Sequence, residues 1–210
     1  MNHLRLIFVG VFLTFASAWL GIVAYSYNNL GHYLPVVSED TGDIAPPPMS
    51  GLAQQGQRVY AANGCVYCHS QQVRQVDVTT SDILRGWGKR PLVARDYMHE
   101  SPAFLGIMRV GPDLANIGER QTNAQWYHRY LYEATTVTPN SIMPSYRYLY
   151  KLQEIQSNKP AEDALTLSGP HAPKAGWEVV PSADAKALVA YLMSLNHNYA
   201  LPEAKEPKLE

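Results

Sequence analysis

The sequence predicts a mainly α-helical fold, in which one N-terminal transmembrane helix carries a single globular domain. Residues 6–27 form an apolar run without a charged side chain. The segment 51–63 follows Ser50, the segment 182–197 begins with Ser182, and both repeat apolar residues at helical spacing. The chain has 210 residues, 46% of them hydrophobic, which suits one domain with one modest core. A net charge of -1 provides no basic surface, so nucleic acid is not an expected partner.

Residues 1–30 are predicted to form a transmembrane anchor. As a helix, residues 6–27 would be about 33 Å long, enough to cross the hydrocarbon core of a bilayer. A cleaved signal peptide is the alternative, because residues 16–18, Ala-Ser-Ala, resemble a cleavage site. The apolar run continues from Trp19 well past that site, which favours the anchor. Both alternatives export the rest of the chain, and Arg5 favours an N-terminus on the inner side.

The chain after the anchor divides into three parts. Residues 31–50 are predicted to be a stiff, extended spacer, because three consecutive prolines, 46–48, lie near their end. Residues 51–199 are the predicted globular domain, and residues 200–210 are expected to be a flexible tail. The first helix of the domain, 51–63, follows Ser50 and has an expected inward face of Leu52, Gly56, Val59 and Tyr60.

A short motif directly after this helix predicts the cofactor. Cys65 and Cys68 are three positions apart, and His69 follows at once. This spacing attaches a c-type haem, whose vinyl groups become thioethers to the cysteines while the imidazole binds the iron. A disulfide or redox-active cysteine pair is one alternative, although it does not need the histidine. A structural zinc site is another, although no second ligand pair is present to complete four ligands.

Further along the chain, a turn and a loop supply candidate partners for this haem. Gly111, Pro112, Asp113 and Leu114 form a compact turn, and the Pro112 carbonyl can accept the proton on the far nitrogen of His69. Met143 lies in a loop directly before a proline, where its thioether suits a second axial ligand better than core packing. Met98 and Met108 remain alternative ligands. Arg74 is a candidate partner for a haem propionate, and other candidate pocket residues are Trp87, Arg90, Arg95 and Arg109.

Two more helices complete the predicted domain. One runs from residue 122 or 123 to 133, with Trp126, Tyr130 and Leu131 inward as core or as one wall of a haem crevice. The other, 182–197, is expected to pack on the first helix, because Gly56 permits close approach of Tyr191 or Leu188. Residues 151–181 between them are polar and rich in proline and glycine, so we expect a surface excursion.

Taken together, these motifs resemble a class I cytochrome c domain. The stretch Gly64 to Arg74, with the Gly111 to Leu114 turn, residues 143–146 and one N-terminal anchor, more closely resembles the mono-haem subunit (subunit II) of cbb3-type cytochrome c oxidase. The resemblance covers most of the chain. It departs at Gln75, where a proline is expected, and in residues 151–181, which show no match.

The resemblance implies an electron-transfer subunit with one covalently bound haem c and with metal ligands His69 and Met143. Cys65, Cys68, Arg74, Gly111, Pro112 and Leu114 are the other expected cofactor-binding residues. The implied partners are a haem-copper catalytic subunit, which reduces oxygen in aerobic respiration, and a further cytochrome c subunit. The implied location is the bacterial inner membrane, crossed once, with the haem domain on the periplasmic or outer side.

Because both axial positions of the iron would be taken, we expect no catalytic residue in this chain. Two alternatives to the oxidase remain open. One is the mono-haem subunit of a nitric oxide reductase, and the other is a free membrane-tethered cytochrome c that carries electrons without an obligate complex.

Overall fold

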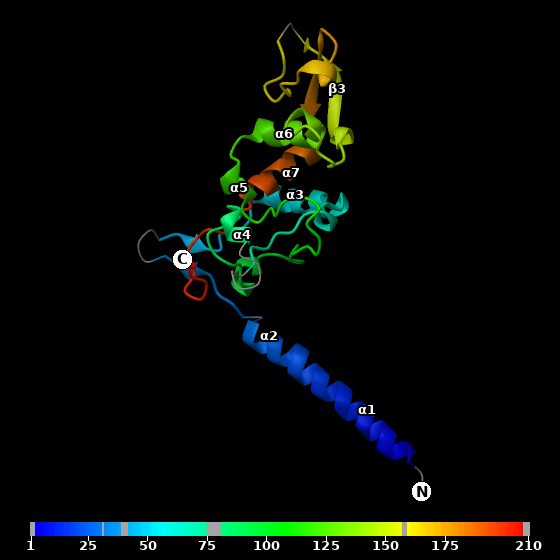
Figure 1. The fold of residues 1–210 in the computed structure, drawn as a ribbon, viewed down its shortest axis with the longest axis vertical. Helices are drawn as coiled ribbons and strands as arrows, with labels where there is room; N and C mark the ends of the chain where they lie inside the picture. Colours follow the sequence, from blue (N-terminus) through cyan, green and yellow to red (C-terminus); the bar gives the residue numbers. More distant parts are fainter. Residues whose placement is uncertain (1–2, 31, 39–41, 75–80, 157–158, 208–210) are drawn as a thin grey trace.

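The computed structural model describes residues 3–30, 32–38, 42–74, 81–156 and 159–207. The fold is mainly helical, with a long N-terminal helix that extends away from a globular part (Figure 1). The helices are α1 (Leu4–Ala18), α2 (Tyr25–Leu30), α3 (Gly51–Ala62), α4 (Ser81–Leu84), α5 (Ile117–Arg120), α6 (Ala124–Tyr132) and α7 (Ala183–Ser194). The strands are β1 (Val36–Val37), β2 (Ile44–Ala45), β3 (Tyr150–Glu154) and β4 (Trp177–Pro181). Short 3-10 turns include Cys65–Tyr67 and Ala94–Tyr97.

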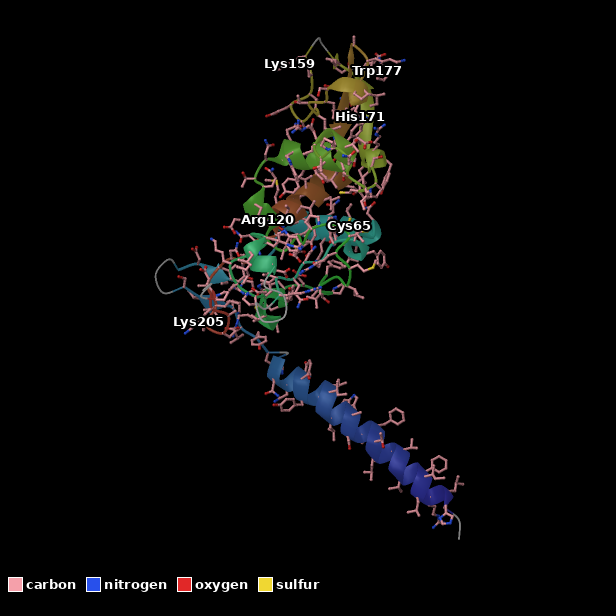
Figure 2. All side chains as sticks on the ribbon, in the orientation of Figure 1. Cys65, Arg120, Lys159, His171, Trp177 and Lys205 are labelled. Atoms are coloured by element: carbon pink, nitrogen blue, oxygen red, sulfur yellow. The ribbon has the colours of Figure 1, made fainter. Side chains whose placement is uncertain are left out.

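The N-terminal helix is continuous over the predicted apolar run. A π-helical segment, Trp19–Ala24, joins α1 to α2, and the combined helix Leu4–Asn29 has 26 residues and a mean hydropathy of 2.3 in its most apolar window. None of that window is buried, and its side chains project outward with no other helix or strand of the described residues against them (Figure 2). The helix is therefore long and apolar enough to cross a membrane.

The globular part is built on the contact between α3 and α7, which confirms the predicted pairing. Ser50 caps α3 by accepting a hydrogen bond from the Ala53 amide, and Ser182 caps α7 in the same way. The two helices touch at Gly56, where an added Cβ would lie 1.9 Å from the Ala187 carbonyl oxygen. Tyr191 is fully buried beside this contact. Helix α7 ends at Ser194, three residues before the predicted end.

The predicted inward face of α3 was wrong at one residue, Leu52. Leu52 is 51% exposed, whereas Ala53, Gly56 and Tyr60 are buried. The face therefore follows a spacing of three and four residues that starts at Ala53, which places Leu52 about 100° away around the helix. Val59 is half-buried at the margin of the core.

Helix α6 confirms the predicted helix that ends near residue 133. Asn123 caps it by accepting a hydrogen bond from the Trp126 amide. Its fully inward residues are Tyr127, His128 and Leu131. Trp126 and Tyr130 are only half-buried, and their ring centroids lie 4.8 Å apart in a stack beside the cavity described below. Sequence spacing thus found the helix and its buried Leu131, and Trp126 and Tyr130 line the cavity, as the alternative of a crevice wall predicted.

The described residues of the segment 151–181, which are 151–156 and 159–181, contain more regular structure than predicted. Strands β3 and β4 pair antiparallel, from Tyr150 opposite Pro181 to Glu154 opposite Trp177. Val179 and Leu165 are buried in the main core, so this segment is not only a surface excursion. Its outer end, with Trp177, lies at the end of the globular part farthest from the N-terminal helix (Figure 2).

The spacer and the tail also differ from their predicted forms. Instead of running as one extended spacer, residues 36–37 and 44–45 form a two-stranded hairpin, β1 with β2. Leu201 and Ala204 of the expected flexible tail are buried against Ala45. Sequence composition missed this contact because it joins two short apolar stretches that are far apart in the chain. The domain boundaries after residues 30, 50 and 199 stay a prediction.

Replacing Gly56 with alanine is expected to destabilise the globular part strongly. The new methyl group would collide with the backbone of Ala187, so the two helices would have to separate. We expect the free energy of unfolding to fall by about 3 kcal/mol, measured by chemical denaturation of the full chain in detergent. Gly51→Ala is the matched control, because nothing lies within 4 Å of its added Cβ. Equal stability of the two variants would contradict this account of the core.

Candidate haem-binding site

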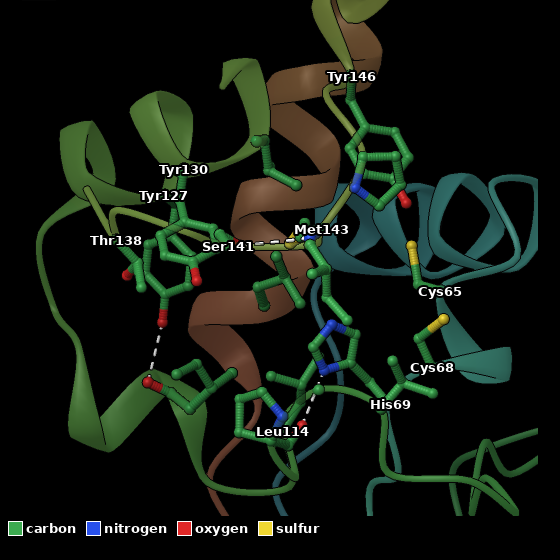
Figure 3. Close-up of a pocket in the computed structure, with 18 of the residues that line it drawn as sticks. Cys65, Cys68, His69, Leu114, Tyr127, Tyr130, Thr138, Ser141, Met143 and Tyr146 are labelled. Atoms are coloured by element: carbon green, nitrogen blue, oxygen red, sulfur yellow. Dashed lines mark hydrogen bonds between the residues drawn. The ribbon is translucent and has the colours of Figure 1, made fainter. Parts of the chain in front are cut away.

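One cavity of about 570 Å³ lies between the cysteine motif and α6 (Figure 3). Its walls come from five parts of the chain: the turn after α3, residues 110–120, α6, the segment 138–146 and α7. The lining is largely apolar and aromatic. It includes Val110, Leu114, Ile117, Trp126, Tyr127, Tyr130, Leu131, Ile142 and Leu192.

The two cysteines lie side by side at one edge of this cavity. Gly64 ends α3 in the left-handed conformation, at φ 67°, which lets the chain turn sharply into the 3-10 turn Cys65–Tyr67. Cys65 is buried, Cys68 is exposed, and both are free thiols. Burial raises the pKa of Cys65 to about 11. A redox-active pair needs a thiol with a lowered pKa, so this environment disfavours that alternative.

His69 is held with one ring nitrogen ready to bind a metal. Its Nδ1 lies 2.8 Å from the carbonyl oxygen of Pro112, as predicted. Because that oxygen can only accept, Nδ1 must carry the proton, which leaves Nε2 with a free lone pair. Desolvation lowers the pKa of His69, while the Pro112 hydrogen bond opposes this effect. The neutral imidazole is the form that binds iron.

Gly111 allows the His69 ring to lie in this position. An added Cβ on Gly111 would be 2.3 Å from His69 Cε1 and 2.7 Å from Nδ1. Any side chain at this position would therefore displace the imidazole. The turn that begins at Gly111 thus supplies both the space for the ring and, one residue later, the hydrogen-bond acceptor.

Met143 lines the same cavity from the segment 138–146. Figure 3 shows it on the side of the His69 ring that faces away from the Pro112 hydrogen bond. Met143 is half-buried, and its backbone amide donates a hydrogen bond to Ser141 Oγ at 3.3 Å. The other two candidate methionines, Met98 and Met108, do not line the cavity.

The cavity brings together seven of the eight residues that the sequence placed at the cofactor. They are Cys65, Cys68, His69, Gly111, Pro112, Leu114 and Met143. Arg74 does not line the cavity, and its backbone amide donates to Asp82 Oδ2. Trp87, Arg90, Arg95 and Arg109 also lie outside the lining. Gln75 falls outside the described residues.

Sequence reasoning missed one cation at the cavity. Arg120, the last residue of α5, contributes to the lining and donates to the backbone carbonyl of Asp113. No local signal marked it, because α5 is only four residues long. The arginines considered instead are held elsewhere: Arg90 pairs with Asp96, and Arg95 pairs with Glu203.

The donor set fits a c-type haem and does not fit a zinc site. Two thiols, a neutral imidazole and a thioether line one largely apolar cavity of about 570 Å³, which suits a flat ring with apolar faces. Among the described residues there is no group of three or more His, Cys, Asp or Glu side chains that could hold a metal ion. The zinc alternative therefore finds no additional ligands in this part of the chain.

The helical fold, the N-terminal apolar helix and this site are those of a cytochrome c domain that carries one apolar helix at its N-terminus. A family model described as cytochrome c oxidase, mono-heme subunit/FixO, matches residues 36–171, well over half of the chain. The chain belongs to this family, the mono-haem subunits of cbb3-type cytochrome c oxidase. No curated protein sequence matches the chain. Membership implies one haem and the presence of other oxidase subunits.

Replacing Gly111 with alanine is expected to displace His69 and reduce haem attachment. The added methyl group would occupy the position of the imidazole, so the Pro112 hydrogen bond would be lost. The ratio of covalent haem to polypeptide, measured from pyridine haemochrome spectra of the purified full chain, should fall several-fold. Gly51→Ala, at an open surface position, should leave this ratio unchanged. Normal haem content with an unchanged spectrum in Gly111→Ala would contradict the proposed role of the turn.

Proposed function

We propose that this chain relays electrons to the haem-copper catalytic subunit of a cbb3-type terminal oxidase in aerobic respiration. The observation that carries the proposal is the arrangement of His69 and Met143 in one apolar cavity beside the cysteine pair. With these two side chains as axial ligands, the iron would have no open position for oxygen. The chain would then transfer electrons and leave oxygen reduction to its partner.

Each residue of the site has a distinct role in this proposal. Cys65 and Cys68 would hold the cofactor covalently, and His69 would bind the iron through Nε2. Met143 would bind on the other face, and its thioether would favour the reduced state and raise the reduction potential. When bound, a c-type haem supplies reversible one-electron chemistry. Apolar residues such as Leu114, Leu131 and Leu192 would exclude water from the cavity.

The proposed setting is the bacterial inner membrane, crossed once by the helix Leu4–Asn29. The globular part would lie on the periplasmic or outer side, close to the catalytic subunit and to a further cytochrome c subunit. The apolar, unburied helix supports the anchor, and family membership supports the oxidase partners. The family match also favours the oxidase over a nitric oxide reductase or a free electron carrier.

Replacing Met143 with alanine tests the ligand. We expect a lower reduction potential and loss of the weak sulfur-to-iron absorption band at the red end of the oxidised spectrum, because thioether ligation would be gone. Met108→Ala is the matched control, because Met108 is 55% exposed and lies outside the cavity. Persistence of the band in Met143→Ala, with its loss in Met108→Ala, would contradict the proposal, because it would show that Met108 is the ligand.

Purification of the membrane complex tests the proposed partner. The tagged full chain should be extracted from membranes only by detergent and should copurify with b-type haem and with oxygen-reducing activity. We expect rapid turnover of oxygen and little turnover of nitric oxide. Preferential turnover of nitric oxide would favour the reductase, and recovery of a lone, reversibly reducible chain would favour the free carrier. Either result would contradict the proposal.

A further inference from the structure

A buried ionic cluster lies behind His69, outside the haem cavity. Its members are Arg109, Asp82, Asp113 and Ser70. The side chains of Asp82 and Asp113 are fully buried, and that of Arg109 is only 15% exposed. Two carboxylates buried with one guanidinium cost free energy unless each is well hydrogen-bonded. The cluster joins the segment that follows His69 to the turn that contains Pro112.

Asp113 joins the turn at Pro112 to the segment that follows His69. Its Oδ2 accepts hydrogen bonds from Ser70 Oγ at 2.6 Å and from the Gln72 amide at 2.8 Å. Its Oδ1 accepts from the Ala115 amide at 2.9 Å. Asp113 directly follows Pro112, so these three bonds also fix the peptide unit whose oxygen faces His69.

Backbone hydrogen bonds strengthen the same connection. The Gly111 amide donates to the Cys68 carbonyl at 2.9 Å, and the Leu114 amide donates to the Ser70 carbonyl at 2.8 Å. These two bonds are made on either side of the His69–Pro112 contact. These bonds therefore fix the position of the turn relative to the haem motif, with the Pro112 oxygen opposite His69 Nδ1.

Arg109 completes the cluster from the outer side. Its Nη1 donates to Asp82 Oδ1 at 2.6 Å, and its Nη2 donates to Asp82 Oδ2 at 2.8 Å. Its Nε donates to Ser70 Oγ at 2.7 Å, and Nη2 also reaches the Gln72 carbonyl at 2.7 Å. One guanidinium thus holds both groups that donate to Asp113 Oδ2, which are the Ser70 hydroxyl and the backbone of Gln72.

We propose that Arg109 and Ser70, acting through Asp113, are positioning residues that hold the Pro112 carbonyl against His69 and thereby set the reduction potential of the haem. The inference rests on the proposed function, because it requires His69 to be an iron ligand. A well-aligned acceptor on Nδ1 increases the basicity of the ligating nitrogen and so favours oxidised iron. Loosening the cluster should therefore raise the reduction potential.

Two variants that conserve net charge test the proposal. Ser70→Ala removes the hydroxyl that bridges Arg109 and Asp113. Arg109→Lys keeps the positive charge but loses the planar guanidinium group, which donates hydrogen bonds to Asp82, Ser70 and Gln72 at once. Because neither variant changes the charge near the haem, a shift in potential would report the geometry of the hydrogen bonds.

Arg85→Lys is the matched control for Arg109→Lys. Arg85 and Arg109 both lie over the Trp87 ring, with their guanidinium carbons 4.9 and 5.2 Å from its centroid. Arg85 is exposed, and among the ion pairs of the described residues it has none. The same substitution at Arg85 should therefore leave the His69 environment unchanged.

The measurement uses the haem-loaded full chain in detergent, reduced and labelled with ¹⁵N-histidine. Solvent exchange of the His69 Nδ1 proton, followed by NMR, should be roughly fivefold to tenfold faster in Ser70→Ala and Arg109→Lys, as expected for a weakened hydrogen bond. The reduction potential should rise in both variants and stay unchanged in Arg85→Lys. Should Arg109→Lys fail to fold, Ser70→Ala decides the outcome alone.

Unchanged exchange and potential in the folded variants would overturn the proposal and leave the cluster a purely structural role. A failure of the haem ligation that the proposed function assumes would look different. In that case the unsubstituted chain itself would lack a low-spin haem spectrum or a haem-shifted His69 signal.

Discussion

The hydrogen bond from His69 Nδ1 to the Pro112 carbonyl is the interaction on which the rest of the site depends. It fixes which ring nitrogen is free, and it aims that nitrogen into the cavity that Met143 also lines. Gly111 leaves room for the ring, since any Cβ there would overlap it. A haem motif without this turn would still supply two thiols and an imidazole. It would not supply a ligand of fixed tautomer and direction.

The core makes this arrangement possible by holding distant segments together. The close contact of α3 and α7 at Gly56 fixes the end of α3, and Gly64 then turns the chain into the cysteine motif. Tyr191 of α7 donates a hydrogen bond to Gln71 Oε1 at 2.9 Å, so the closing helix also contacts the segment after His69. The stability of the core and the geometry of the site are therefore coupled, and substitutions at Gly56 should disturb both.

Local features of the sequence predicted the parts of the structure that depend on local interactions. Serine caps and apolar spacing found α3 and α7, and the Cys65 to His69 spacing with the Pro112 turn found one wall of the cavity. The β3–β4 pairing was missed, because it joins residues over twenty positions apart through a segment rich in proline and glycine. Arg120 and the burial of Leu201 against Ala45 were missed for the same physical reason, since only tertiary packing creates them.

The central claim is that the haem of this chain has both axial positions filled and transfers electrons without binding oxygen. Carbon monoxide binds reduced haem iron only at an open or weakly held position, so it tests this claim most directly. The measurement is the optical difference spectrum of the reduced, full-length chain in detergent with and without carbon monoxide. The account predicts no spectral change. A carbon monoxide complex that forms in full at neutral pH would show an open iron and would contradict the account.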